Sequence, residues 1–335
     1  MKKILLKKPP FKNILPLLVF IVGFISLGMG KYPIAPGTVF EVLLHPEGAR
    51  QNLPLEYQVI WTIRLPRLLT AFCAGAGLAL CGAALQGVFH NPLVDPHVIG
   101  VTSGAAFGGA LAILLGASGG VLMLCAFGFG MGALVLVYAL AGLLKQESNL
   151  ILVLAGLILN GFFSALVSMI QYLADTETKL PNIVFWLMGS FANADWPKTG
   201  LFALAFLPGT VLLLRLRWRI NVLSLGSRDA KALDRNAAFA KPVILTLCAL
   251  IVSAQVAVSG SIGWIGLVIP HLARIVGGFD HRAVLPTAML LGGGFMILVD
   301  DCARMLSSAE IPLGIITAVL GAPFFTVLLL RTRKI

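Results

Sequence analysis

The sequence predicts an all-α membrane protein, a bundle of about ten transmembrane helices. Of its 335 residues, 58% are hydrophobic and only 12% are charged, and the mean hydropathy is +0.95. A water-soluble domain of this size needs more charge to cover its surface. The apolar runs Ile14–Gly30 and Ile311–Leu330 are 17 and 20 residues long, close to the length that spans a hydrocarbon core of about 30 Å. Lipid leaves no backbone group unpaired, so such runs indicate helices rather than barrel strands.

We expect one transmembrane domain over residues 1–335. The predicted helices cover approximately residues 13–32, 64–88, 95–115, 119–143, 150–173, 198–217, 242–260, 263–278, 284–303 and 311–331. The first apolar run follows Lys2, Lys3, Lys7 and Lys8, but this run is too long for the core of a signal peptide and lacks a small-residue cleavage site. It is therefore predicted to be an uncleaved first helix.

The basic residues indicate the orientation of the bundle. The formal net charge is +11. If the N-terminus lies in the cytoplasm, most Lys and Arg residues fall in hydrophilic segments on the cytoplasmic side. Cytoplasmic loops of membrane proteins carry this excess, so we expect both termini in the cytoplasm. No basic face alternates with aromatic residues as a nucleic-acid groove would require, so we expect no nucleic-acid partner.

Two hydrophilic segments are longer than simple turns. Residues 174–197 are predicted outside and carry Trp186 and Trp196, residues typical of the membrane interface. Residues 218–241 are predicted in the cytoplasm as two short amphipathic helices with a turn at Gly226. The expected apolar face of this segment consists of Leu223, Leu225, Ala230 and Leu233.

No enzyme signature occurs in the chain, so we expect no catalytic residues, no metal site and no cofactor. ATP hydrolysis needs a G-x-x-x-x-G-K-[ST] loop around the phosphates, yet the chain's Gly30-Lys31 pair is followed by Tyr32. The five cysteines show no C-x-x-C spacing and are expected to pack as small apolar residues. Energy for any transport would have to come from a partner or an ion gradient.

One helix carries a polar stripe. At 100° per residue a narrow arc of the helix predicted over 150–173 holds Asn160, Ser164, Ser168 and Gln171. These groups could be interhelical hydrogen-bond contacts worth about 0.6 kcal/mol each. Four of them over three turns favour a water-lined translocation pathway instead.

Several motifs resemble one transporter family. They are RLPRLLTAFCAGAGLALCGAALQGVFHNPLVDPHVIGVTSG over 64–104, VAVSGSIGWIGLVIPHLARIVGGFDHRAVLP over 256–286, and AEIPLGIITAVLGAPFFTVLLLR over 309–331. The chain resembles permeases of the FecCD type, the iron-siderophore, haem and cobalamin importers with the type II ABC importer fold. The cytoplasmic NVLSLGSRDAKALD resembles the family's segment that docks on the ATPase.

The resemblance implies an importer permease in the bacterial inner membrane. It would work as a homodimer with two ATP-binding cassette subunits and an extracytoplasmic substrate-binding protein, and would carry a ferric siderophore, haem, cobalamin or an oxyanion. The arginines expected to dock the binding protein are Arg64, Arg67 and Arg304. Interfacial snorkelling is the alternative for these side chains. The residues expected to contact the ATPase are Leu225, Gly226, Ser227, Arg228, Ala230 and Leu233.

One departure from the family concerns the ATPase-docking segment. The family usually has an acidic Leu-Gly-Glu-type run there, whereas this chain has Leu225-Gly226-Ser227-Arg228. An ion-coupled secondary transporter is the alternative function, but it would need a carboxylate near the membrane midplane, and Asp300 and Asp301 lie at a predicted helix end. A structural scaffold would explain neither the outer arginines nor the long cytoplasmic segment.

Overall fold

The computed structural model describes residues 11–143, 149–234, 237–307 and 309–332, and across these residues it contains helices and no strand. Ten long helices correspond to the ten predicted spans, with ends that differ by a few residues. They are α1 (Phe11–Gly28), α5 (Leu65–Phe89), α6 (Val101–Leu114), α7 (Gly119–Leu143), α8 (Asn149–Leu173), α10 (Trp196–Arg215), α13 (Ala237–Ser259), α14 (Ile265–Gly277), α15 (His281–Met305) and α16 (Leu313–Thr332). The predicted all-α fold class is confirmed.

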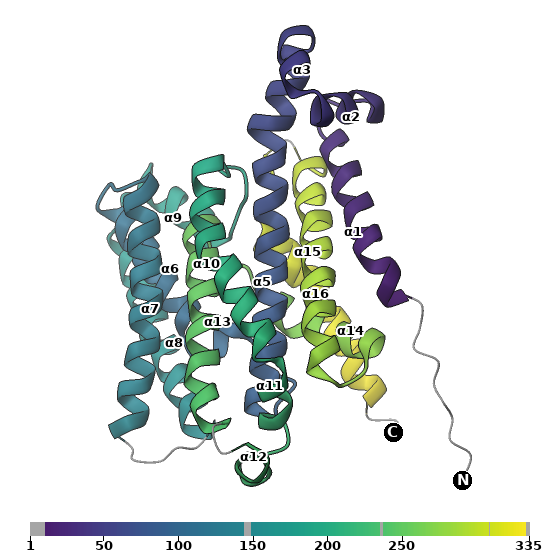
Figure 1. The fold of residues 1–335 in the computed structure, drawn as a ribbon. Helices are drawn as coiled ribbons and strands as arrows, with labels where there is room; N and C mark the ends of the chain where they lie inside the picture. The colour runs from purple at the N-terminus through teal and green to yellow at the C-terminus, as the bar shows by residue number, and fades with distance from the viewer. Residues whose placement is uncertain (1–10, 144–148, 235–236, 308, 333–335) are drawn as a thin grey trace, which may run out of the picture.

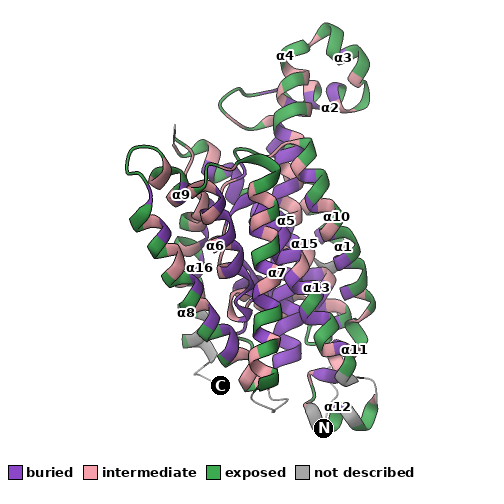
Figure 2. Ribbon diagram, turned by 90° about the vertical axis from the view of Figure 1, so that its left-hand side faces the viewer, coloured by how far each residue is buried: buried purple, intermediate pink, exposed green. Residues whose placement is uncertain are grey.

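Length and composition divide these helices into two groups. Six are long and apolar enough to cross a membrane on their own: α5 with its N-terminal extension, α7, α8, α10, α13 and α15. In the other four, the apolar stretch found in the described residues is shorter: Ile14–Gly28 in α1, Val101–Leu114 in α6, Ile265–Gly277 in α14 and Leu313–Val327 in α16. Of the most apolar 18-residue segment of α8, only 22% is buried, whereas the corresponding segment of α5 with its N-terminal extension is 78% buried. The helix α5 is therefore central, and α8 exposes most of its surface (Figure 2).

Short helices that the sequence analysis left out project from one end of the bundle (Figure 1). They are α2 (Pro36–Leu44), α3 (Pro46–Asn52) and α4 (Pro54–Tyr57). Each begins with a proline at its first position, where the missing N–H costs nothing and the fixed φ suits a helix. A π-helical segment, η1 (Gln58–Arg64), joins α4 to α5. The continuous helix Pro54–Phe89 has 36 residues and is about 54 Å long, which exceeds the hydrocarbon core.

Other short elements occupy both ends. The helix α9 (Lys179–Leu187) lies toward the end that carries α2–α4, and α11 (Arg217–Leu223) and α12 (Ser227–Leu233) lie at the opposite end (Figure 1). A 3₁₀ turn, η2 (Pro96–Ile99), precedes α6. The predicted helix over 95–115 therefore begins later, because Gly100 adopts a left-handed conformation with φ 81°.

The helices α5 and α15 pack closely along their length. A Cβ on Gly75 would lie 2.1 Å from the carbonyl oxygen of Gly292, and a Cβ on Gly292 would lie 2.4 Å from the carbonyl oxygen of Gly75. Only glycines allow the two backbones to approach this closely, which is how helices pack where lipid provides no hydrophobic drive. We call these two helices the α5–α15 pair.

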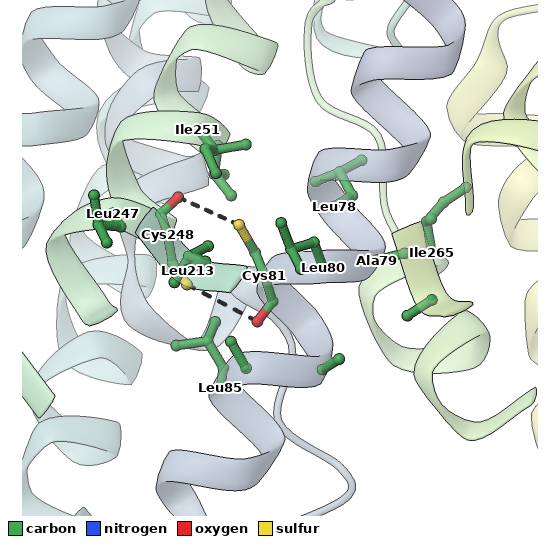
Figure 3. Close-up of a cluster of buried hydrophobic side chains, with 14 of the residues drawn as sticks. Leu78, Ala79, Leu80, Cys81, Leu85, Leu213, Leu247, Cys248, Ile251 and Ile265 are labelled. Atoms are coloured by element: carbon green, nitrogen blue, oxygen red, sulfur yellow. Dashed lines mark hydrogen bonds between the residues drawn. The ribbon is translucent and has the colours of Figure 1, made fainter. Parts of the chain in front are cut away.

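The core also includes the contact of α5 with α13. Cys81 and Cys248 are buried there, and each thiol points to the carbonyl oxygen of the other residue, at 3.9 and 4.0 Å (Figure 3). Both cysteines pack as small apolar residues, as predicted. The same prediction is wrong for Cys302, which is exposed.

Candidate functional site

Arg67 is the centre of a buried ionic cluster at the end of the bundle that carries α2–α4. Its Nε and Nη2 donate to the two carboxylate oxygens of Asp300 at 2.9 and 2.8 Å. Its Nη1 and Nη2 donate to Glu310 at 2.9 and 3.0 Å. The guanidinium fork thus grips two carboxylates, the geometry for which arginine is best suited. Arg67 is only 6% exposed.

Arg304 and Arg64 lie close to this contact. Arg64 is buried, and it donates to the carbonyl oxygens of Leu27 and Tyr32 at 2.7 and 2.6 Å. Arg304 contacts the Asp301 carboxylate and donates to Ser26 Oγ at 3.2 Å. Together these side chains connect α1 to α15. We call the ionic residues the arginine cluster: Arg64, Arg67, Asp300, Asp301, Arg304 and Glu310.

The structure brings the three predicted docking arginines together, but it gives each of them internal partners. Three arginines and three carboxylates balance the formal charge of the cluster. The guanidinium groups of Arg64 and Arg67 are therefore neither free nor on the surface, unlike what direct docking would require. Sequence reasoning placed Asp300 and Asp301 at a helix end and missed the pairing of Asp300 with Arg67, which lies 233 positions away in the chain.

The predicted coupling segment does form two short helices that meet at Gly226. This glycine has φ +108° and ψ 155°, a conformation essentially limited to glycine. The prediction of one shared apolar face is wrong: Leu223 and Ala230 are buried, whereas Leu225 and Leu233 are 57% and 64% exposed. The side chains of Ser227 and Arg228 lie outside the described part of the structure.

The predicted polar stripe on α8 divides into two parts. Asn160 faces the bundle, because its Nδ2 donates to the carbonyl oxygen of His97 at 2.8 Å and its Oδ1 accepts from Ser103. Ser164 and Ser168 are exposed and Gln171 is half-buried. Leu166, on the other side of the helix, packs against the buried cluster between α7 and α8. The four stripe residues thus do not share one environment, because Asn160 has protein partners and the two serines are exposed.

A small cavity lies next to Asn160, where two helix breaks meet. It has a volume of about 320 Å³ and is lined by Asp95, His97, Gly263, Trp264 and Leu267. His97 Nε2 lies 3.3 Å from the carbonyl oxygen of Ile262, so the break before α6 contacts the break before α14. Trp264 adopts the unusual φ of 72°. Sequence reasoning missed this cavity, although Pro96 and the glycines around both breaks are signals for interrupted helices.

The cavity and the stripe contain no metal-binding cluster: no group of three or more His, Cys, Asp or Glu side chains in the described chain could hold an ion. The cavity offers a carboxylate, an imidazole and an indole along with backbone groups.

Comparison with known proteins gives a consistent result. The FecCD transport family matches residues 17–331. The molybdate import system permease protein MolB of Haemophilus influenzae is 50% identical over 320 residues, which cover 96% of this chain and 95% of that protein. The vitamin B12 import system permease protein BtuC of Salmonella typhimurium is 38% identical over 325 residues, with coverages of 96% and 94%.

Solved structures agree with this relationship. A metal-chelate type ABC transporter in an inward-facing conformation is 50% identical and superposes with a TM-score of 0.87, covering 96% of this chain and 99% of that one. PsaBC of Streptococcus pneumoniae, at 17% identity and a TM-score of 0.57, shares the fold over 85% of this chain. The family match over nearly the whole sequence and these close relatives show that the chain belongs to the FecCD transport family, the permeases of ABC importers.

Proposed function

We propose that this chain is the membrane-spanning subunit of an ATP-driven importer in the bacterial inner membrane, with α11 and α12 in the cytoplasm. The observation that carries the proposal is the family match over residues 17–331. The position of α11 and α12 at the end of the bundle opposite α2–α4 supports it (Figure 1). In this orientation the first residues of α1 and the last residues of α16 face the cytoplasm, in agreement with the distribution of basic residues.

In this proposal ATP hydrolysis belongs to two separate ATP-binding cassette subunits. The sequence contains no G-x-x-x-x-G-K-[ST] phosphate loop. Exposed Leu225 and Leu233 offer apolar contacts at the surface of the α11–α12 segment. Because Gly226 sets the angle between the two short helices, it determines how these leucines are presented to the ATPase.

A homodimer would cover the exposed apolar surfaces of α8 and α16, which lie along the same side of the bundle in Figure 2. The surface of α8 includes Leu157 and Phe162, and that of α16 includes Val319 and Leu320.

The translocation path would lie near the axis of this dimer. The exposed Ser164 and Ser168 lie on α8 and would line the path there. The cavity at Asp95 and His97 would lie along the same path.

A substrate-binding protein would dock at the end that carries α2–α4 and the arginine cluster. Since Arg64 and Arg67 are buried, we propose that they shape this surface, and that partly exposed Arg304 contacts the partner more directly. Docking affinity of Arg304→Glu should fall at low and at physiological salt, because reversal places like charges together. Arg217→Glu at an exposed position of α11, at the opposite end of the bundle, is the control, and equal affinity of Arg304→Glu and wild type would remove Arg304 from the docking surface.

We propose an oxyanion such as molybdate as the cargo, because MolB is 50% identical over almost the full length. The 38% identity to a vitamin B12 permease leaves a metal chelate as the second candidate. The cargo is tested by the ligand that co-purifies with the cognate binding protein. Molybdate in that protein supports the first candidate, and a corrinoid or ferric chelate supports the second.

An ion-coupled secondary transporter remains the alternative function, and the charge distribution argues against it. Within the described helices α13, α14 and α16 no acidic residue occurs, and α15 carries Asp300 and Asp301 near its end, paired with arginines. A coupling-ion site would require a carboxylate that can be loaded and released near the midplane.

The experiment that tests the energy source uses the purified permease alone and with its ATPase subunits. The permease alone should show no ATP hydrolysis. The reconstituted complex should hydrolyse ATP faster when the cargo-loaded binding protein is added. Hydrolysis by a rigorously pure permease, or ATPase activity that never responds to permease and binding protein, would refute the proposal.

A further inference from the structure

A polar contact set ties the proposed coupling segment to the transmembrane helices. Asn221 in α11 donates through Nδ2 to Asp280 at 2.6 Å and accepts at Oδ1 from the backbone N–H of His281 at 2.8 Å. A backbone N–H can only donate, so the orientation of the Asn221 amide is fixed by chemistry. Asp280 also caps α15 by accepting from the N–H of Arg282. Asn221 therefore holds the first turn of α15 in place.

The ring of His281 adds a second bond to the same oxygen. His281 Nδ1 lies 2.8 Å from Asn221 Oδ1, so Nδ1 carries the proton and donates. The ring is buried and reaches α5, where a Cβ on Gly87 would lie 2.6 Å from His281 Nε2. Gly87 thus leaves space for the ring. One imidazole connects α11, α15 and α5.

Two further contacts hold α11 in the same position. His90, the left-handed C-cap of α5 with φ 51°, contacts the carbonyl oxygen of Leu223 through its ring. The Arg282 guanidinium lies over the Trp218 ring, 4.5 Å from its centroid, a cation–π contact between α15 and α11. We call this set the Asn221 cluster: His90, Asn221, Asp280 and His281.

The Asn221 cluster and the arginine cluster lie at the two ends of the same pair of helices. Residues of α5 and α15 meet at Gly75 and Gly292 in the middle. At the far end Arg67 of α5 grips Asp300 of α15 at 2.8 Å. At the near end the His281 ring lies against Gly87, and both helices are bonded to α11. Close backbone packing, an ion pair at one end and a shared partner helix at the other are the arrangement expected of two helices that move as one body.

We propose that Asn221 and His281 are positioning residues that transmit movement of the α11–α12 segment to the α5–α15 pair and, through it, to the arginine cluster at the opposite end. This inference rests on the proposed function, since it assumes that ATPase subunits move α11 and α12. It goes beyond that function by assigning the transmission to a defined set of side chains.

The test compares movement at the two ends of the complete complex. Cys73, Cys125 and Cys302, the cysteines that are not buried, are replaced by Ser. One spin label is placed at Ala232→Cys in α12 or at Arg50→Cys in α3, both exposed positions. In a homodimer each label reports one distance between protomers, measured by pulsed electron paramagnetic resonance with and without a non-hydrolysable ATP analogue.

In the wild-type background both labels should change distance when nucleotide binds. Asn221→Leu and His281→Leu should keep the shift at position 232 and lose it at position 50. His281→Asn should restore the shift at position 50, because its side-chain amide can donate from nearly the same place as Nδ1.

Two outcomes overturn the inference. One is a distance shift kept at position 50 in both leucine variants. The other is loss of the shift at both positions, which would assign Asn221 to ATPase docking. No nucleotide response at position 232 in the wild-type complex would instead refute the proposed function.

Discussion

Replacing Arg67 by Met removes every donor from the centre of the arginine cluster and keeps a side chain of similar length. Asp300 is 3% exposed and would lose three hydrogen bonds from Arg67. Arg304 Nε lies 3.4 Å from Asp300 but makes no hydrogen bond to it, so it can replace Arg67 only in part. Removal of one partner from a buried ion pair costs about 3–5 kcal/mol, because the other charge remains buried.

Thermal unfolding in detergent, followed by tryptophan fluorescence, measures this loss. With the unfolding entropy typical of globular proteins, about 0.7 kcal/mol per degree for a chain of this length, the expected fall in Tm is about 4–7 °C. Arg50→Met on exposed α3 is the matched control and should change Tm by less than about 1 °C. Adding Asp300→Asn to Arg67→Met should recover part of the loss, since it removes the orphan carboxylate.

The competing interpretation of Arg67 as a docking residue predicts a different result. In that case Arg67→Met would leave Tm unchanged and would weaken only the affinity for the binding protein. An Arg67→Met Tm equal to that of Arg50→Met would therefore refute the structural role of the arginine cluster.

Three further predictions concern the packing, the coupling segment and the pathway. Gly75→Ala should lower Tm by several degrees, because its Cβ would lie 2.1 Å from a backbone oxygen, whereas Gly132→Ala in open space should not; equal values would contradict the close α5–α15 packing. Gly226→Val should lower the amount of cargo transported per ATP hydrolysed, because valine is strained at φ +108°; an unchanged ratio would remove Gly226 from coupling. Ser164→Cys should react with a membrane-impermeant maleimide in the reconstituted transporter at a rate that changes with ATP, and Leu166→Cys should not; the reverse pattern would reject the pathway assignment.

The long helices could be predicted from the sequence because each one coincides with its own apolar run. Apolar length alone locates all ten, and the turn at Gly226 follows from a glycine between two short apolar patterns. On α8 local periodicity separates exposed Ser164 from Leu166, which packs against a buried cluster, but it does not separate Ser164 from Asn160, which has protein partners.

What the sequence analysis missed depends on contacts between distant segments or on a change of helix direction. Nothing local to Arg67 indicates that its partner is Asp300, 233 positions away. Leu223 was assigned to the same face as Leu233, but the chain changes direction at Gly226, between α11 and α12, so one helical wheel cannot describe both helices. The helices α2 to α4 are too short to be recognised from apolar length, and only the proline that begins each of them is a local helix-start signal.

Uptake into sealed proteoliposomes tests the central claim, that this permease works in an ATP-driven importer, most directly. The vesicles contain permease and ATPase subunits, with the cargo-loaded binding protein outside and ATP inside. Radiolabelled molybdate is the first cargo, and the ligand found in the binding protein replaces it if the two differ. The account predicts uptake that requires enclosed ATP and persists when an ionophore abolishes all ion gradients. Uptake that proceeds without ATP and stops when the gradients are abolished would contradict it and identify an ion-coupled transporter.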